Sequence, residues 1–487
     1  MFRRMKLSHR VAALAVAALL LPGLRAFAQT PSSSSGDEFE QDNGKPQPKA
    51  DKSDKSDEGS AKADAPVDPA PAATSKPAAP AAPEATSDNP YVPYAPPLAP
   101  LGIEVPNASI HFGLLAQPQL EVAGGPDATL TSKNLFLRRI RFMVGGTLYK
   151  YFEFFFDTDY PNLFKNDSSV TMAGTFKNAP GMNVQDAYIT VKPLGELIKI
   201  DAGFMLPPGP HNGLESAAKL YTTDYFVNTF RRSIFSDSDP LGSAGQNPQG
   251  RDLGVQVRWL PLGGHIDVRG GVFQGIRNNP VPGPPAEVGD YNIFRLAGRV
   301  QINLLDAEPG FFYQGTYLGS KRILSFGGFY DYQHQDAGAT NATYKYYGGD
   351  AIVDLPVGPG ILTAQADYVR WNDETGITIT SLDMVTSVPT NTAFMVQAGY
   401  LIAPIMLSPF VQYEHLVAPD TAGTDANGNA VLIPDPTNPS ENRYSGGLSF
   451  WPYGHNMNLK VLGAHVTRNP APHAFNQINV QWQLYFF

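Results

Sequence analysis

Charged and apolar side chains alternate residue by residue in the stretch "LFLRRIRFMVGGTLYKYFEFFFDTDY", residues 135–160. The apolar set has one parity and the charged set the other: Ile140, Phe142, Val144, Phe152, Phe154 and Phe156 against Arg139, Arg141, Glu153 and Asp157. Successive side chains of a strand point to opposite faces, so the pattern predicts strands with one apolar and one charged face. A soluble core would bury such charges only at high cost.

The same alternation returns in "DLGVQVRWL" and "IFRLAGRVQINL", residues 252–260 and 293–304. A soluble sandwich and a membrane barrel both produce it, with the apolar face inward in the first and outward in the second. Three features favour the barrel. The periodic segments run for about 10 to 14 residues, aromatic residues gather near their ends, and tight and long connections alternate.

The connections predict the strand count. Tight connections such as "PLGE", "PLGG" and "PYGH" alternate with long polar ones at residues 206–250, 276–290, 372–390 and 417–441. Treating residues 304–322 as a long periplasmic turn leaves an even number of strands. We therefore predict an all-β transmembrane antiparallel β-barrel of about 16 strands, with short periplasmic turns and long external loops.

Three regions differ in composition. Residues 1–28 combine early basic residues, the apolar run Val11–Leu21 and "AFA" at 26–28, which indicates a secretory signal peptide. Residues 29–105 are rich in Ala, Pro, Lys and Asp and read as a disordered periplasmic tether, for which peptidoglycan is a candidate partner. Residues 106–487 are assigned to the barrel.

Charge and motif content exclude several classes of function. The chain has 36 basic and 45 acidic residues and no cysteine. Subtracting the 11 basic and 13 acidic residues of positions 1–105 leaves 25 and 32 for the barrel, which argues against a nucleic-acid partner. The sequence lacks H-E-x-x-H, G-x-S-x-G and Walker patterns, so we expect no enzyme, no metal site and no cofactor.

Four stretches resemble the phosphate-selective porin O/P family of trimeric outer-membrane channels. They are "RRIRFMVGGTLYKYFEFFFDTD", "DAYITVKP…IKIDAGFMLPPG", "LDAEPGFFYQGTYLG" and the closing "INVQWQLYFF". The resemblance covers about residues 107–487. It implies a homotrimer, an inward-folded third loop and phosphate as a permeant. The acidic balance departs from the basic path that phosphate selectivity needs. The terminal Phe487 also falls outside the apolar parity that ends at Phe486.

Candidate site residues follow from the parity of the strands. Those expected to line the pore are Arg139, Arg141, Glu153, Asp157, Arg258, Arg269, Arg295 and Arg299. Arg139 and Arg141 are expected to face the acids Glu153 and Asp157 on the next strand. Cross-strand pairing that stabilises the wall and a positive field acting on anions are both open roles for the arginines. Arg231 and Arg232 lie in the third loop, where a constriction folded into the pore and an exposed external loop are alternatives.

These patterns predict an outer-membrane porin for passive diffusion of small hydrophilic solutes and ions, with a preference for anions or phosphate. Its expected partners are outer-membrane lipid, two further copies of the chain and the permeating solutes. A non-conducting structural barrel, anchored through its periplasmic tail, is the alternative.

Overall fold

The computed structural model describes the chain in ranges that all belong to one compact unit, Ala85–Phe487. They are residues 89–98, 100–125, 132–165, 182–226, 250–275, 294–337, 340–373, 378–381, 384–387, 391–418, 420–424, 430–434, 440–469 and 474–487.

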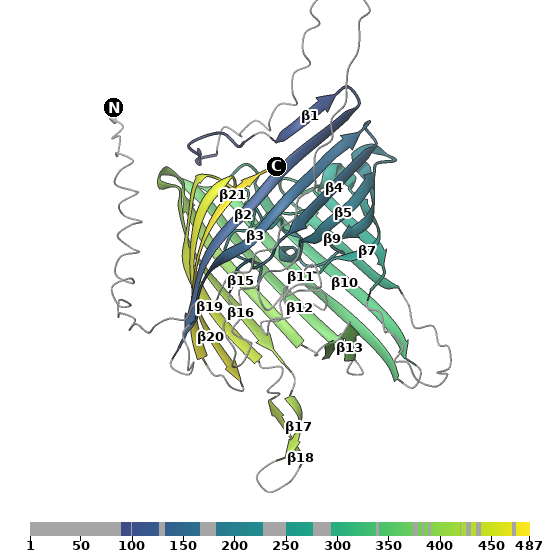
Figure 1. The fold of residues 1–487 in the computed structure, drawn as a ribbon, viewed down its shortest axis with the longest axis vertical. Coiled ribbons are helices and arrows are strands. Elements are labelled where there is room, and N and C mark those ends of the chain that lie inside the picture. Colours follow the sequence, from purple (N-terminus) through teal and green to yellow (C-terminus); the bar gives the residue numbers. More distant parts are fainter. Residues whose placement is uncertain are drawn as a thin grey trace, which may run out of the picture. The chain divides into compact units, whose positions relative to one another are not determined.

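Sixteen antiparallel strands form a closed barrel (Figure 1), which confirms the predicted fold class. The barrel closes because β2 pairs with β3 along one edge and with β21 along the other. The barrel strands are β2 (Ala108–Gly124), β3 (Ser132–Leu148), β4 (Phe152–Asp159), β5 (Asn183–Val191), β6 (Ile198–Met205), β7 (Asp252–Trp259), β8 (Ile266–Phe273), β9 (Arg295–Asn303), β10 (Ile323–Ala337), β11 (Thr340–Val357), β12 (Gly360–Asp373), β15 (Asn391–Ile402), β16 (Leu407–Val417), β19 (Ser440–Tyr453), β20 (Met457–Asn469) and β21 (Ala474–Phe486).

In the part of the chain that the structure describes, five further strands lie outside this ring. Two hairpins, β13 with β14 and β17 with β18, extend from the long-loop end of the barrel in Figure 1. Their bounds, with that of the fifth strand, are β13 (Thr378–Ser381), β14 (Met384–Ser387), β17 (Asp420–Thr424), β18 (Ala430–Pro434) and β1 (Leu101–Val105).

Residues 89–105 pack on the tight-turn end of the barrel. The hydroxyl of the buried Tyr91 donates to the Trp451 carbonyl at 2.6 Å, and the Tyr94 amide donates to the Pro452 carbonyl at 2.8 Å. Strand β1 then pairs with the first residues of β2. The sequence assigns these residues to the tether, so the structured part of the chain begins before residue 106.

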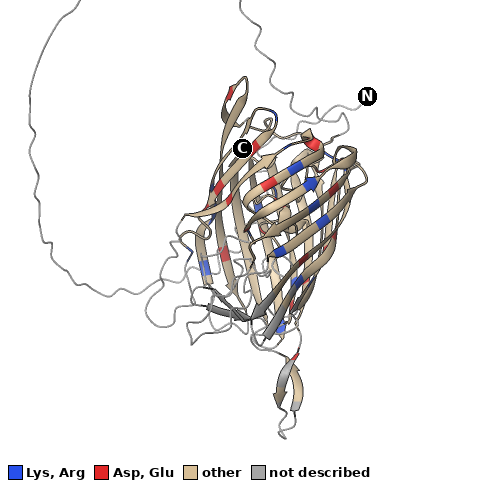
Figure 2. Cartoon of the chain, turned by 90° about the vertical axis from the view of Figure 1, so that its right-hand side faces the viewer, with Lys and Arg blue, Asp and Glu red and all other residues tan. Residues whose placement is uncertain are grey.

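The two faces of the wall follow the predicted alternation. In β7, Val255 and Val257 are 49% and 43% exposed, whereas Gln256 and Arg258 are 1% and 2% exposed. The apolar face therefore points outward, where a barrel meets lipid, and the polar face points inward. Basic and acidic residues are interspersed over the same strands in Figure 2. Among the described residues, no helix is long and apolar enough to cross a bilayer.

Two segments between strands fold into the barrel. Residues 206–226 follow β6 at the long-loop end, and residues 304–322 connect β9 to β10 at the tight-turn end. Residues 206–226 and the central part of the second segment, residues 308–319, are largely buried. Apolar side chains of both segments form a core with inward-facing wall residues such as Leu115 and Met143. The prediction of a connection at 304–322 is confirmed, but this connection enters the lumen because its apolar residues have wall partners there.

Candidate functional site

Segments 206–226 and 304–322 meet inside the barrel through their backbones. The Tyr313 amide donates to the Leu214 carbonyl at 2.9 Å, and the Ser216 amide donates to the Tyr313 carbonyl at 3.0 Å. A third bond runs from the Gly315 amide to the Lys219 carbonyl, also at 3.0 Å. These bonds satisfy backbone groups that would otherwise be buried without partners, so each segment supports the other.

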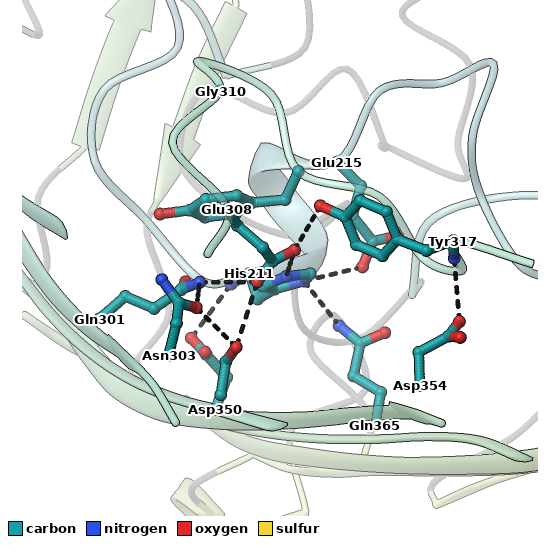
Figure 3. A network of polar contacts seen from close by, with 12 residues as sticks. His211, Glu215, Gln301, Asn303, Glu308, Gly310, Tyr317, Asp350, Asp354 and Gln365 are labelled. Atoms are coloured by element: carbon teal, nitrogen blue, oxygen red, sulfur yellow. Dashed lines mark hydrogen bonds and ion pairs between the residues drawn. The ribbon is translucent and has the colours of Figure 1, made fainter. Parts of the chain in front are cut away.

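A histidine at this junction bridges the two segments (Figure 3). His211 Nδ1 lies 3.1 Å from Glu215 Oε1, and its Nε2 lies 3.4 Å from Glu308 Oε1. The ring also stacks on Tyr313 with centroids 4.7 Å apart. All of these side chains are buried. We call His211, Glu215 and Glu308 the junction triad.

The junction triad has shifted proton affinities. Burial lowers the pKa of His211, but the carboxylates of Glu308 and Glu215 outweigh burial and raise that pKa to about 10. Burial raises the pKa of Glu308, but His211 outweighs it and brings that pKa below its usual range. Burial raises the pKa of Glu215. The charged imidazolium is therefore the favoured form between its two acids at neutral pH.

Three predicted pore arginines form one row across the wall. Arg258 of β7 lies directly opposite Arg269 of β8, and Arg269 lies directly opposite Arg299 of β9. Each has a carboxylate of its own: Arg258 Nε lies 2.6 Å from Asp201, Arg269 Nη2 lies 2.7 Å from Asp267, and Arg299 Nη1 lies 2.6 Å from Asp350. We call Arg258, Arg269 and Arg299 the arginine row.

Segment 304–322 covers the arginine row. The Arg269 guanidinium donates to the carbonyls of Phe311 and Gly310 at 2.8 and 2.9 Å. It also lies 4.6 Å from the ring centroid of Tyr313. Guanidinium planes stack well on aromatic rings, so the row serves as the docking surface of this segment.

A β-bulge turns two neighbouring arginines inward. The register between β2 and β3 shifts at Gln117 and Pro118, and both Arg138 and Arg139 are buried. Their guanidinium groups hold the two carboxylate oxygens of Asp224 at 2.8 and 2.6 Å. Asp224 belongs to segment 206–226, so this clamp fixes that segment to the wall.

The remaining predicted wall residues also have partners. Arg141 lies 2.9 Å from Asp159 and 3.5 Å from Asp157. Glu153, expected opposite the arginines, instead accepts a bond from Lys192 Nζ at 2.7 Å. The final predicted residue, Arg295, pairs with Asp331.

The structure brings Arg258, Arg269 and Arg299 together and separates Arg139 from Glu153 and Asp157, its expected partners. Arg231 and Arg232 lie outside the described residues. Sequence reasoning missed Arg138, Asp224 and the junction triad. Asp224 has no parity signal because it lies outside a strand, and alternation alone places Arg138 on the outer face. The described residues hold no cluster of three or more His, Asp or Glu side chains suited to a metal ion.

No protein-family model matches the chain, and no curated protein matches it. Among solved structures, the anion-selective porin from Comamonas acidovorans aligns with a TM-score of 0.48 and 12% identity, over 78% of this chain and 100% of that chain. OmpF of Salmonella typhi, in complex with daunomycin, aligns with a TM-score of 0.47 and 13% identity, over 79% of this chain and 100% of OmpF. The outer membrane channel DcaP of Acinetobacter baumannii aligns with a TM-score of 0.45 and 14% identity, over 79% of this chain and 99% of DcaP.

These likenesses are distant, so the class of protein is defined by the chain's own strands. A closed antiparallel barrel with an apolar outer face and a charged interior is a transmembrane β-barrel. The resemblance to the phosphate-selective porin O/P family stays a prediction.

Proposed function

We propose that the chain is a bacterial outer-membrane porin through which small hydrophilic solutes and ions diffuse passively. The observation that carries this proposal is the sixteen-stranded wall itself, because a barrel of this size encloses a lumen wide enough for water. Segments 206–226 and 304–322 narrow that lumen, so the porin passes only small solutes. On this account the chain is exported by residues 1–28, and residues 29–88 lie in the periplasm within reach of peptidoglycan.

The proposed preference for anions rests on the balance of charges inside the barrel. Each arginine of the row has a carboxylate partner within 2.7 Å, so the row contributes little net field to the lumen. Lys219 of segment 206–226 is half-buried, and its ammonium has neither an ion pair nor a hydrogen bond with any of the described residues. We assign the anion preference, phosphate included, to Lys219. Association into a homotrimer rests on the sequence resemblance.

Liposome swelling tests the porin proposal. Vesicles containing the purified protein should swell in isosmotic arabinose faster than in a disaccharide, because the inserted segments restrict the passage of the larger sugar. In a salt gradient, the reversal potential should favour chloride over potassium, and the preference should weaken at about 1 M salt, where the screening length falls to about 3 Å. Swelling equal to that of protein-free vesicles would contradict the proposal.

One observation favours the second candidate, a non-conducting structural barrel anchored through its tail. Residues of both inserted segments bond to the wall and to each other, and the arginine row beneath them is at most 2% exposed. If the segments seal the lumen, the vesicles do not swell and no ion current flows, although the barrel is folded.

A further inference from the structure

A cavity of about 230 Å³ lies inside the barrel between the wall and the two inserted segments. Wall strands β2 to β4, the end of β21 and both segments contribute to its lining. Phe155, Phe312, Phe487 and Lys219 in that lining are each partly exposed, so solvent reaches the cavity. None of these four residues belongs to the junction triad or to the arginine row.

Three phenylalanines from distant parts of the chain form one wall of this cavity. The ring centroid of Phe155 lies 5.8 Å from that of Phe312 and 5.6 Å from that of Phe487, in edge-to-face arrangements. Gly145 leaves room for the terminal ring, since a Cβ at this position would lie 2.8 Å from Phe487 Cζ. Inward positions of the wall are mostly polar, so this aromatic wall is a local apolar surface in a wet lumen.

The charged groups of the lining differ in how far they are satisfied. Arg141 is paired with Asp157 and Asp159, and Glu215 is paired with His211. Lys219 is different, because no described residue supplies its ammonium with an acceptor. Burial lowers the pKa of Lys219, and the neighbouring Lys321 lowers it further. An anion beside Lys219 would offset both effects.

We propose that this cavity binds small aromatic monocarboxylates as they pass through the barrel, with the carboxylate on Lys219 and the ring against Phe155, Phe312 and Phe487. The size agrees, because a cavity of about 150 Å³ holds a benzene molecule, whereas drug-sized ligands need about 300 Å³ or more. One ring with one carboxylate therefore fills the site. The assignment of these compounds as permeants rests on the proposed porin function, whereas their binding does not.

Calorimetry on the full-length protein in low-salt buffer tests the site, with benzoate as the probe. Acetate lacks the ring and benzamide lacks the charge, so both should bind at least about tenfold more weakly than benzoate. Lys219→Gln should lower the affinity for benzoate about tenfold, whereas Lys219→Arg should keep most of that affinity. Phe312→Leu should lower the affinity for benzoate about threefold and leave the affinity for acetate unchanged.

Lys199→Gln is the matched control. It removes one lysine charge from the inner wall, where Lys199 pairs with Glu196 and does not line the cavity. Its benzoate affinity should equal that of the unmodified protein. Equal affinities for benzoate and acetate, or a Lys219→Gln variant as tight as Lys199→Gln, would overturn the site. If Lys219→Gln fails to give a heat-modifiable folded band, the comparison of the three ligands on the unmodified protein decides.

Failure of the site and failure of the porin proposal give different results. If the protein binds benzoate saturably but carries no current, the proposed site is supported and the proposed porin function is contradicted. If the protein conducts chloride, and benzoate and acetate reduce that current to the same extent, the porin function is supported and the proposed site is contradicted.

Discussion

Asp224 attaches segment 206–226 to the wall through two ion pairs. Arg138 and Arg139 both reach its carboxylate, and the side chain of Arg139 is fully buried. Removing one partner of a buried ion pair leaves an uncompensated charge, which costs more than the pair itself contributes. The loss of Asp224 should therefore destabilise the docked segment.

We predict that Asp224→Asn destabilises the folded barrel by about 2–3 kcal/mol, since two buried guanidinium groups lose their carboxylate. Chemical denaturation followed by tryptophan fluorescence measures this. Asp306→Asn is the control, because the ion pair of Asp306 with the exposed Arg322 guanidinium is long, at 3.8 Å. Asparagine keeps an oxygen that can accept the Arg322 amide, so the effect should be well below about 1 kcal/mol. Equal effects of the two variants would refute the clamp.

The junction triad makes the contact between the segments depend on pH. The pKa of His211 is raised to about 10 in the folded protein, above its unfolded value of about 6.5. The stability that His211 contributes is therefore fully present below about pH 6.5 and lost as the pH rises through about 10. Other groups around His211 are Asp350 of β11, Gln365 of β12 and Tyr313.

We predict that His211→Gln lowers the melting temperature at pH 6, and that its difference from the unmodified protein shrinks as the pH approaches 10. His465→Gln, at an exposed position bonded to Asn476, should show no such trend. If the melting temperature of His211→Gln lies below that of the unmodified protein by the same amount from pH 6 to 10, the imidazolium is not the form that stabilises the junction.

At the scale of elements, alternation predicts the wall well and the lumen poorly. The inward positions of β7 and β9 follow from parity alone, because each side chain of a regular strand faces one of only two sides. The bulge at Arg138 breaks parity and depends on pairing between strands, which no local pattern records. Segment 304–322 enters the lumen through contacts with distant strands. The aromatic run "GFFYQGTY", unusual for a solvated turn, is the one local signal of that insertion.

Residues 89–105 attach to the barrel through Tyr91, Tyr94 and strand β1, and residues 29–88 belong to the tether that the composition predicts. We predict that deleting residues 29–88 leaves the melting temperature unchanged. Tyr91→Ala should cost about 3 kcal/mol, because a buried ring and its bond to Trp451 are lost. Tyr94 is 50% exposed, so Tyr94→Ala should cost clearly less. Equal stability of the two alanine variants would show that residues 89–98 do not hold the barrel end.

The last two residues have different environments. The apolar parity of β21 ends at Phe486 on the outer face, whereas the Phe487 ring packs inside against Phe155. We predict that removing Phe487 alone reduces outer-membrane insertion less than removing both residues, measured as heat-modifiable band in the membrane fraction. Equal losses from the two deletions would contradict the hypothesis that the apolar outer-face pattern needed for insertion ends at Phe486.

For the molecule as a whole, the central claim is that a sixteen-stranded barrel, narrowed by two inserted segments, conducts ions. Single-channel recording in planar bilayers in about 1 M KCl tests this most directly. The account predicts discrete current steps, and larger steps for Tyr313→Gly, which removes the ring stacked between His211 and Arg269. Folded, membrane-inserted protein that gives no steps in either form would contradict the account.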